Sequence, residues 1–196
     1  MANVCMDTVV FYATLDSQKE GFFQLKQAVA DCYPQGIDVD DSRLCRIFEQ
    51  NGISTDGLCL RSDIADVSLE DGQITLYCDS AWSPMYEAYL CLANHFGVCF
   101  ELMAEESGNG IYINTDINGA YLTPRYKAYL SERPEDGSLD VLFDVAGTDT
   151  DFYFDSEDDL LQWFRERGGI TADSAQALQN ILGEDHVSIH EFVNPY

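Results

Sequence analysis

The hydrophobic positions in the first half of the chain follow two periods, one typical of strands and one typical of helices. Residues 4–13 form an apolar run rich in β-branched and aromatic side chains, which predicts a buried strand. Apolar residues three or four positions apart predict a helix over residues 17–32. Segments 65–69 and 73–79 alternate apolar and polar residues on either side of Asp71-Gly72, a pair typical of tight turns, and so predict a hairpin.

A second helix and further strands are predicted after this hairpin. The Ser83 side chain can accept hydrogen bonds from the first amides of a helix, and Pro84 is suited to the first helical position. A helix is therefore predicted over residues 84–96, ending at Gly97. Three of its residues are predicted to face the core: Tyr86, Leu90 and Ala93. Alternation predicts a strand over residues 98–105, and a Gly-rich turn leads into another over residues 111–115.

This order of elements is typical of a ferredoxin-like α+β fold, in which helices cover one face of an antiparallel sheet. We expect residues 1–122 to form such a domain. A further helix, capped by Asp40 or Asp41 and ending at Asn51-Gly52, is predicted as an insertion near residues 40–51.

Residues 123–196 are expected to form a C-terminal α+β extension packed on the first domain, with the order ββ(β)ααβ. Its first three strands are predicted at residues 125–131, 139–145 and 152–154. Two helices follow, one from Ser156 to Gly168 and one over residues 172–182 capped by Thr171, and a closing strand spans residues 186–193.

The charge of the chain excludes several classes of function. It has 10 Lys and Arg residues against 35 Asp and Glu residues, a formal net charge of −25. Direct nucleic-acid binding by a basic face and a polybasic membrane anchor are both excluded, because each needs clustered Lys and Arg. There is no apolar stretch of spanning length and no positively charged segment before the first apolar run, so a cytoplasmic protein without membrane contact is expected.

The negative charges gather in two segments that contain no Lys or Arg. Residues 62–124 hold ten acidic residues, and residues 134–164 hold ten more. An acidic run is most often a solvated face, but a surface this one-sided also suits steering or a basic partner. A folded chain of this length is about 42 Å across, and B-DNA carries about 25 phosphates over that length, which matches the net charge.

Metal-binding and catalytic patterns are weak. Residues 114–119 resemble the start of a calcium loop, but the first position is Asn114 and the twelfth is Arg125 rather than Glu. Two pairs could share a face and hold a metal: Cys91 with His95, and His186 with His190. Neither pair has a third ligand nearby, the seven cysteines lack Cys-x-x-Cys spacing, and no nucleophile elbow or phosphate-binding loop occurs. We therefore expect no cofactor and no metal.

Three segments carry a family resemblance. They are Met1-Ala2-Asn3-Val4-Cys5, Ile74-Thr75-Leu76-Tyr77-Cys78-Asp79-Ser80-Ala81-Trp82-Ser83-Pro84 and Glu105-Glu106-Ser107-Gly108-Asn109-Gly110-Ile111-Tyr112. These resemble the YubB-type ferredoxin-like-domain proteins of plasmids, phages and integrative elements, over about the first two-thirds of the chain. The resemblance implies a mobile-element origin, no known catalytic residues and interference with host machinery. Trp82 is expected to plug the corner between sheet and helix.

Together these observations predict a non-enzymatic acidic protein that binds a basic, nucleic-acid-handling partner, as a nucleic-acid mimic of the anti-restriction or anti-CRISPR kind. The partner-binding carboxylates are predicted to be Asp149, Asp151, Asp155, Glu157, Asp158, Asp159, Glu105 and Glu106. Two alternatives stay open. One is a metal-assisted hydrolase using carboxylates with His95, His186 or His190, and the other is an interaction module whose acidity only maintains solubility.

Overall fold

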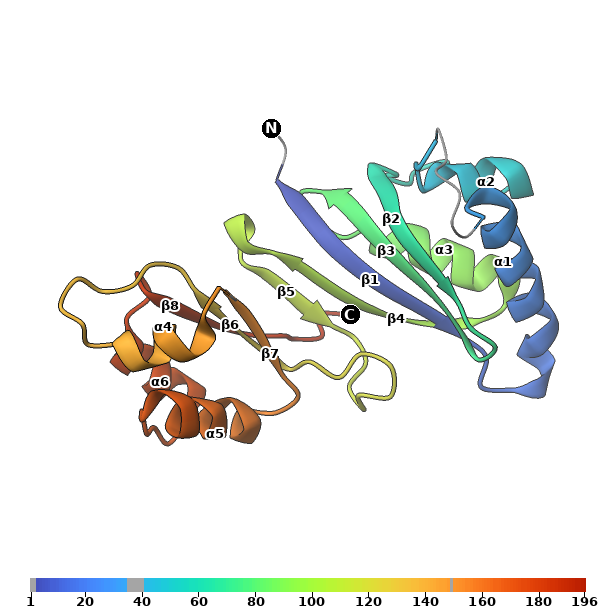
Figure 1. Cartoon of the computed structure of the whole chain (residues 1–196). Coiled ribbons are helices and arrows are strands. Elements are labelled where there is room, and N and C mark those ends of the chain that lie inside the picture. Colours follow the sequence, from blue (N-terminus) through green and yellow to red (C-terminus); the bar gives the residue numbers. More distant parts are fainter. Residues whose placement is uncertain (1–2, 35–40, 149) are drawn as a thin grey trace. The chain divides into compact units, whose positions relative to one another are not determined.

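The computed structural model describes residues 3–34, 41–148 and 150–196, and the chain divides into two compact units (Figure 1). Unit 1 ends at Thr115 and unit 2 runs from Asp116 to Tyr196. Each unit has its own hydrophobic core and its own antiparallel sheet with helices, so the fold is mixed α+β. Among the described helices, none has both the length and the apolar character needed to cross a bilayer.

Unit 1 is built on a five-stranded sheet in the order β2-β3-β1-β4-β5, with every neighbouring pair antiparallel. The strands are β1 (Val4–Tyr12), β2 (Ser62–Leu69), β3 (Gln73–Ala81), β4 (Cys99–Glu106) and β5 (Ile111–Asn114). The predicted strands of the first half are therefore confirmed, and the hairpin closes where Leu69 pairs with Ile74 around Asp71-Gly72.

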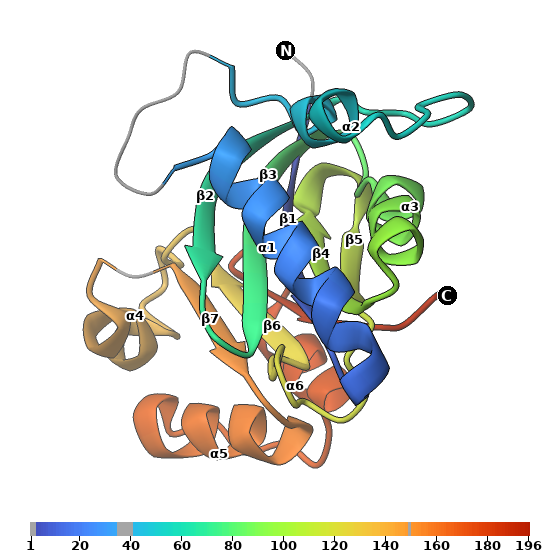
Figure 2. The same cartoon turned by 90° about the vertical axis from the view of Figure 1, so that its right-hand side faces the viewer.

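Two long helices, α1 (Lys19–Cys32) and α3 (Tyr86–Phe96), pack on the same face of this sheet (Figure 2). They bury the strand residues that alternate toward them, such as Cys5, Val9 and Phe11 of β1. The core side of α3 confirms the prediction for Ala93 but not for Leu90, which is only partly buried. It consists of Ala88, Tyr89, Leu92, Ala93 and Phe96. Tyr86 is only partly buried and its ring instead packs on Phe100, with centroids 5.4 Å apart.

The short helix α2 (Cys45–Asn51) occupies the predicted insertion and ends at Gly52, whose φ of 65° closes the helix in the left-handed conformation. The predicted cap is wrong for Asp41, because Leu44 occupies the N-cap position and the Asp41 carboxylate instead binds the Arg43 guanidinium. Asp40 lies outside the described residues.

Unit 2 contains a three-stranded antiparallel sheet in the order β7-β6-β8 with three helices. Its elements are β6 (Tyr126–Leu130), α4 (Asp140–Ala146), β7 (Asp151–Phe154), α5 (Glu157–Gly168), α6 (Ala175–Leu182) and β8 (Val187–Glu191). Its core is formed by one side of the sheet and the helices, including Ala128, Leu130, Leu142, Leu160, Phe164, Leu178 and Leu182.

Two sequence predictions in unit 2 are wrong. The segment predicted as a strand over residues 139–145 is the helix α4, because its buried residues Leu139, Leu142 and Ala146 recur at helical spacing while Val141 and Val145 are exposed. Helix α6 begins three residues later than predicted, since the Ser174 hydroxyl, and not Thr171, accepts the cap hydrogen bond from the amide of Ala177.

Candidate functional site

The face of the five-stranded sheet opposite α1 and α3, called the outer face here, presents a group of exposed side chains at the end where β1 begins. Strand register places directly paired residues on the same face, and Val4 pairs with Ala81, Met6 with Asp79 and Asp79 with Asp63. The outer-face cluster consists of Val4, Met6, Asp63, Asp66, Tyr77 and Asp79. Its apolar members are unusually open to solvent, with Val4 55%, Met6 52% and Tyr77 42% exposed.

A β-bulge in β2 brings a second carboxylate of that strand onto the outer face. Ile64 pairs with Cys78 and Asp66 pairs with Tyr77, so Ala65 is an extra residue without a partner in the register. Regular alternation would turn Asp66 toward the helices, three residues after Asp63. The bulge restores it to the outer face, a local change that is often found next to functional sites.

The carboxylates of the cluster have no positive counterpart in the sheet. Strands β1–β5 contain seven acidic residues and no Lys or Arg: Asp7, Asp63, Asp66, Asp79, Glu101, Glu105 and Glu106. Asp63 and Asp79 lie directly opposite each other, a like-charge pair that destabilises a sheet. The free protein therefore carries an electrostatic cost at this position that a positively charged ligand would relieve.

A surface recess of about 610 Å³ adjoins the cluster. Val4, Asp63 and Asp79 line it together with Arg43 and Arg61. The guanidinium of Arg43 already donates to both carboxylate oxygens of Asp41 at 2.8 Å, so it does not neutralise Asp63 or Asp79. The recess is therefore lined by both acidic and basic side chains.

Trp82 follows β3 and is exposed, which contradicts the prediction that it plugs the corner between sheet and helix. Its φ of 73° is the one positive value among the described residues other than glycine, and 46% of its surface is accessible. The left-handed turn breaks the alternation of the strand, and Met85, which is 5% exposed, belongs to the core of unit 1. A bulky side chain in this conformation costs about 1–2 kcal/mol, and such strain is often found at functional positions.

On the face of the sheet that α1 and α3 cover, the buried carboxyl group of Asp7 forms the centre of a polar network. Asp7 is 2% exposed, and its Oδ2 accepts hydrogen bonds from the hydroxyls of Ser80 and Tyr89, each at 2.7 Å, and from the amide of Met85 at 3.3 Å. The hydroxyls of Ser80 and Ser62 also lie within hydrogen-bond distance of each other, at 3.0 Å. Burial raises the pKa of Asp7 although the hydrogen bonds from Ser80 and Tyr89 oppose the shift. This network connects three strands to α3 and is structural in character.

The acidic run of unit 2 supplies six of the eight predicted partner-binding carboxylates, and the structure divides it. Asp149 lies outside the described residues. Glu157 accepts a hydrogen bond from the amide of Ala175 at 2.7 Å and so caps α6. Three carboxylates remain exposed where β7 leads into α5: Asp155, Asp158 and Asp159. Two of these, Asp158 and Asp159, lie in the first turn of α5, where negative charge interacts favourably with the helix end.

Asp151 forms an ion pair with a buried lysine of the neighbouring strand. Its Oδ1 lies 2.6 Å from Nζ of Lys127, whose side chain is 5% exposed. Partial burial acts to raise the pKa of Asp151, but the hydrogen bond and the charge of Lys127 outweigh it, and the pKa is lowered. Asp151 therefore serves to neutralise Lys127.

We expect Asp151→Asn to lower the free energy of unfolding of unit 2 by about 1 kcal/mol at pH 7, since it leaves a buried ammonium group without this carboxylate. The lowered pKa of Asp151 means that the pair stabilises the fold above the ordinary carboxyl pKa, and that this contribution is lost as the pH falls through the lowered value. The difference between variant and wild type should thus shrink between pH 7 and pH 3. Urea unfolding in a Trp82→Phe background, where Trp163 is the single tryptophan, measures this difference. The exposed Asp155→Asn is the control and is expected to stay within about 0.5 kcal/mol of wild type.

Glu105 and Glu106 do not belong to an exposed acidic surface, so their inclusion in the predicted binding set is wrong. They are 6% and 4% exposed. Glu106 accepts hydrogen bonds from the amides of Gly108 and Asn109, at 2.8 and 2.7 Å, and thereby closes the short 3₁₀ turn η2 (Ser107–Asn109) between β4 and β5. A Glu-Glu pair at the end of an alternating strand gave no sign of this capping function.

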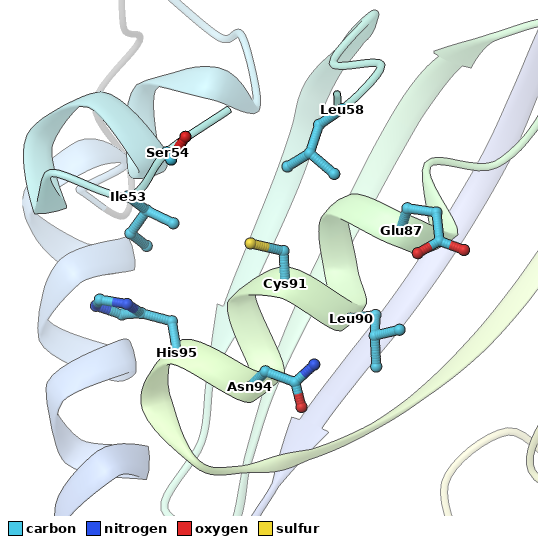
Figure 3. A pocket seen from close by; sticks show the side chains of 8 residues that line it. All are labelled: Ile53, Ser54, Leu58, Glu87, Leu90, Cys91, Asn94 and His95. Carbon is cyan, nitrogen blue, oxygen red and sulfur yellow. The ribbon is translucent and has the colours of Figure 1, made fainter. Parts of the chain in front are cut away.

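The two residue pairs considered for a metal are in different surroundings. Cys91 and His95 both line a shallow pocket of about 570 Å³ between α3 and the loop after α2, together with Ile53 and Leu58 (Figure 3). His186 Nδ1 lies 2.9 Å from the carbonyl oxygen of Glu132. No group of three or more His, Cys, Asp or Glu side chains placed to hold a metal ion is found in residues 3–34, 41–148 and 150–196.

The segment that resembles a calcium loop is a turn closed by its own amides. Oδ2 of Asp116 accepts hydrogen bonds from the backbone amides of Tyr121 and Leu122, at 2.6 and 2.9 Å. The guanidinium of Arg125 donates to the backbone carbonyl of Asp116. The carboxylate thus organises the loop itself.

The chain matches no protein-family model, no curated protein and no solved structure. Sequence reasoning missed the outer-face cluster. The alternation of Val4 and Met6, and of Tyr77 and Asp79, was visible in the chain, but their common face depends on strand register, and the bulge at Ala65 has no signal in the sequence.

Proposed function

We propose that the protein acts by binding, as an acidic, non-enzymatic protein that occupies the cationic groove of a nucleic-acid-handling host protein and excludes its substrate. Restriction enzymes and RNA-guided defence enzymes have such grooves, and a mobile-element, cytoplasmic setting suits this action. The observation that carries the proposal is the acidic outer face of the five-stranded sheet, where Asp63, Asp66 and Asp79 are exposed and the strands contain no Lys or Arg. Steering by this field would speed encounter with a basic partner.

We also assign unit 1 to the ferredoxin-like class. Its first four strands have the spatial order β2-β3-β1-β4, and the connections β1-α1-β2 and β3-α3-β4 each pass over the same face of the sheet (Figure 2). In this assignment β5 extends the sheet beside β4 and α2 is an insertion. This is the class of fold that the resemblance to YubB-type proteins implies.

The proposal predicts competition with DNA. The protein should inhibit purified restriction endonucleases and RNA-guided nucleases whose DNA-binding grooves are strongly basic, and a non-cleavable competitor duplex should reduce its binding to the enzyme. Because exposed charges are screened by salt, inhibition should weaken about tenfold or more between 50 and 300 mM NaCl. Inhibition that is unaffected by competitor duplex and by salt would contradict mimicry.

A further inference from the structure

We propose that the outer-face cluster is the docking surface of the protein and that its occupant is a segment of the partner protein that presents arginine beside apolar side chains. This inference rests on the proposed function and names the part of the molecule that carries it. It replaces the acidic run at the start of α5 as the principal contact.

The acidic half of the surface is suited to a guanidinium group. Asp63 and Asp79 face each other across neighbouring strands, which lie about 4.8 Å apart, and Asp66 follows on the same face. None of these three carboxylates forms an ion pair with a described residue. A planar guanidinium can bind carboxylates through two parallel hydrogen bonds and would relieve the repulsion between Asp63 and Asp79.

The aromatic residues of the surface favour binding of arginine over lysine. Its apolar residues favour a protein partner over a free cation. Tyr77 lies directly opposite Asp66, and the exposed Trp82 follows the strand that carries both Tyr77 and Asp79. Guanidinium groups stack on aromatic faces as well as binding carboxylates, whereas an ammonium group acts as a point charge. Val4 and Met6 continue the surface on β1 and leave more than half of their area open, so apolar side chains of the partner would be buried there.

The carboxylates at the start of α5 lack these features. Asp159 accepts a hydrogen bond from the Ser156 hydroxyl at 2.6 Å, and Asp158 lies in the same first turn. Their position at a helix N-terminus is explained by stabilisation of the helix itself. In the cluster, Asp63 accepts a hydrogen bond from the Ser42 hydroxyl at 3.1 Å and Asp66 accepts one from the amide of Val67 at 2.8 Å, but the directly opposed Asp63–Asp79 pair works against folding.

A direct test uses a synthetic 12-residue peptide of alternating arginine and leucine as the probe, with binding measured by calorimetry. The outer triple variant, Asp63→Asn/Asp66→Asn/Asp79→Asn, is expected to weaken binding at least tenfold. A matched control triple, Glu20→Gln/Asp56→Asn/Glu70→Gln, changes the net charge equally at exposed positions of unit 1 outside the cluster and should change binding less than threefold. Equal weakening by both triples would overturn the proposal, because it would show dependence on net charge alone.

A second measurement does not depend on the folding of the triple variant. In a Trp163→Phe protein, Trp82 is the single remaining tryptophan, so its fluorescence reports the proposed surface. The arginine peptide should shift its emission, and the corresponding lysine peptide should bind at least threefold more weakly. An unchanged emission at saturating peptide would reject the surface.

Failure of this inference can be distinguished from failure of the proposed function. Nuclease inhibition that is equal for wild type and the outer triple would leave mimicry intact and reject this surface. Peptide binding reported by Trp82, without inhibition of any nuclease, would support this surface and reject mimicry.

Discussion

A single methyl group at position 21 is expected to lower the free energy of unfolding of unit 1 by about 3 kcal/mol. Gly21 lies in α1 where this helix passes the end of α3, and a Cβ there would be 1.6 Å from the carbonyl oxygen of Phe96 and 2.8 Å from its carbonyl carbon. Both atoms belong to the backbone, so no side-chain rotation can relieve the clash. Gly21→Ala must therefore separate the two helices that cover the sheet.

The expected decrease in the free energy of unfolding is specific to this packing, because Gly→Ala in a helix ordinarily increases stability. In an exposed helix, replacing Gly with Ala stabilises by about 0.5–1 kcal/mol, because alanine restricts the unfolded chain. Urea unfolding of the Trp163→Phe protein, followed at Trp82, measures the stability of unit 1. Gly72→Ala is the control, because a Cβ at Gly72 would have no neighbour within 4 Å. The free energy of unfolding of this variant should match or exceed that of the wild type. Stabilisation by Gly21→Ala would show that the helices are not packed as described.

The elements that could be predicted from the sequence are those whose hydrophobic period is supported by turn chemistry. Strand β3 and its hairpin were predicted from alternation around Asp71-Gly72, and the end of α3 from its Gly stop. The predicted Ser-Pro start of α3 is wrong, because the helix begins at Tyr86 and Met85 occupies the N-cap position. Helix α4 was misjudged because two of its residues, Val141 and Val145, are β-branched, although the burial of Leu142 and Ala146 follows a helical period. Seven residues are too few for composition and period to be distinguished reliably.

The candidate site was harder to predict than the fold, because it depends on which face each carboxylate occupies. Counting acids along the chain treats Glu106 and Asp79 alike, yet one caps a turn in the interior and the other is exposed on the sheet. Some acidic residues that lie close together in the sequence have structural partners, such as Asp151 with Lys127. The exposed carboxylates of the outer face come from two strands and become neighbours only through register and a bulge.

Removal of the buried carboxyl group is the second large effect that we expect. Asp7→Ala should lower the free energy of unfolding of unit 1 by about 3 kcal/mol, because it leaves the hydroxyls of Ser80 and Tyr89 and the amide of Met85 without their acceptor in the core. Tyr89→Phe removes one of these donors and should cost less than Asp7→Ala. Equal stability of Asp7→Ala and wild type, measured at Trp82 in urea, would show that the network does not hold α3 to the sheet.

Asp7→Asn separates the hydrogen bonds from the charge, because the amide oxygen can still accept from Ser80 and Tyr89 while the group no longer ionises. Burial raises the pKa of Asp7, and the thiols of Cys5 and Cys78, whose pKa values are also raised by burial, offer no positive charge to offset it. Because the pKa of Asp7 is raised in the folded protein, the protonated carboxyl group contributes its full stability below the ordinary carboxyl pKa of about 3.9. The wild type loses this stability as the pH rises through the raised pKa. The stability of Asp7→Asn relative to wild type should therefore increase from pH 4 toward neutral pH. A relative stability that is constant with pH would show that Asp7 titrates as an ordinary carboxyl group, and the interior of unit 1 would then have to accommodate a charge that nothing around it neutralises.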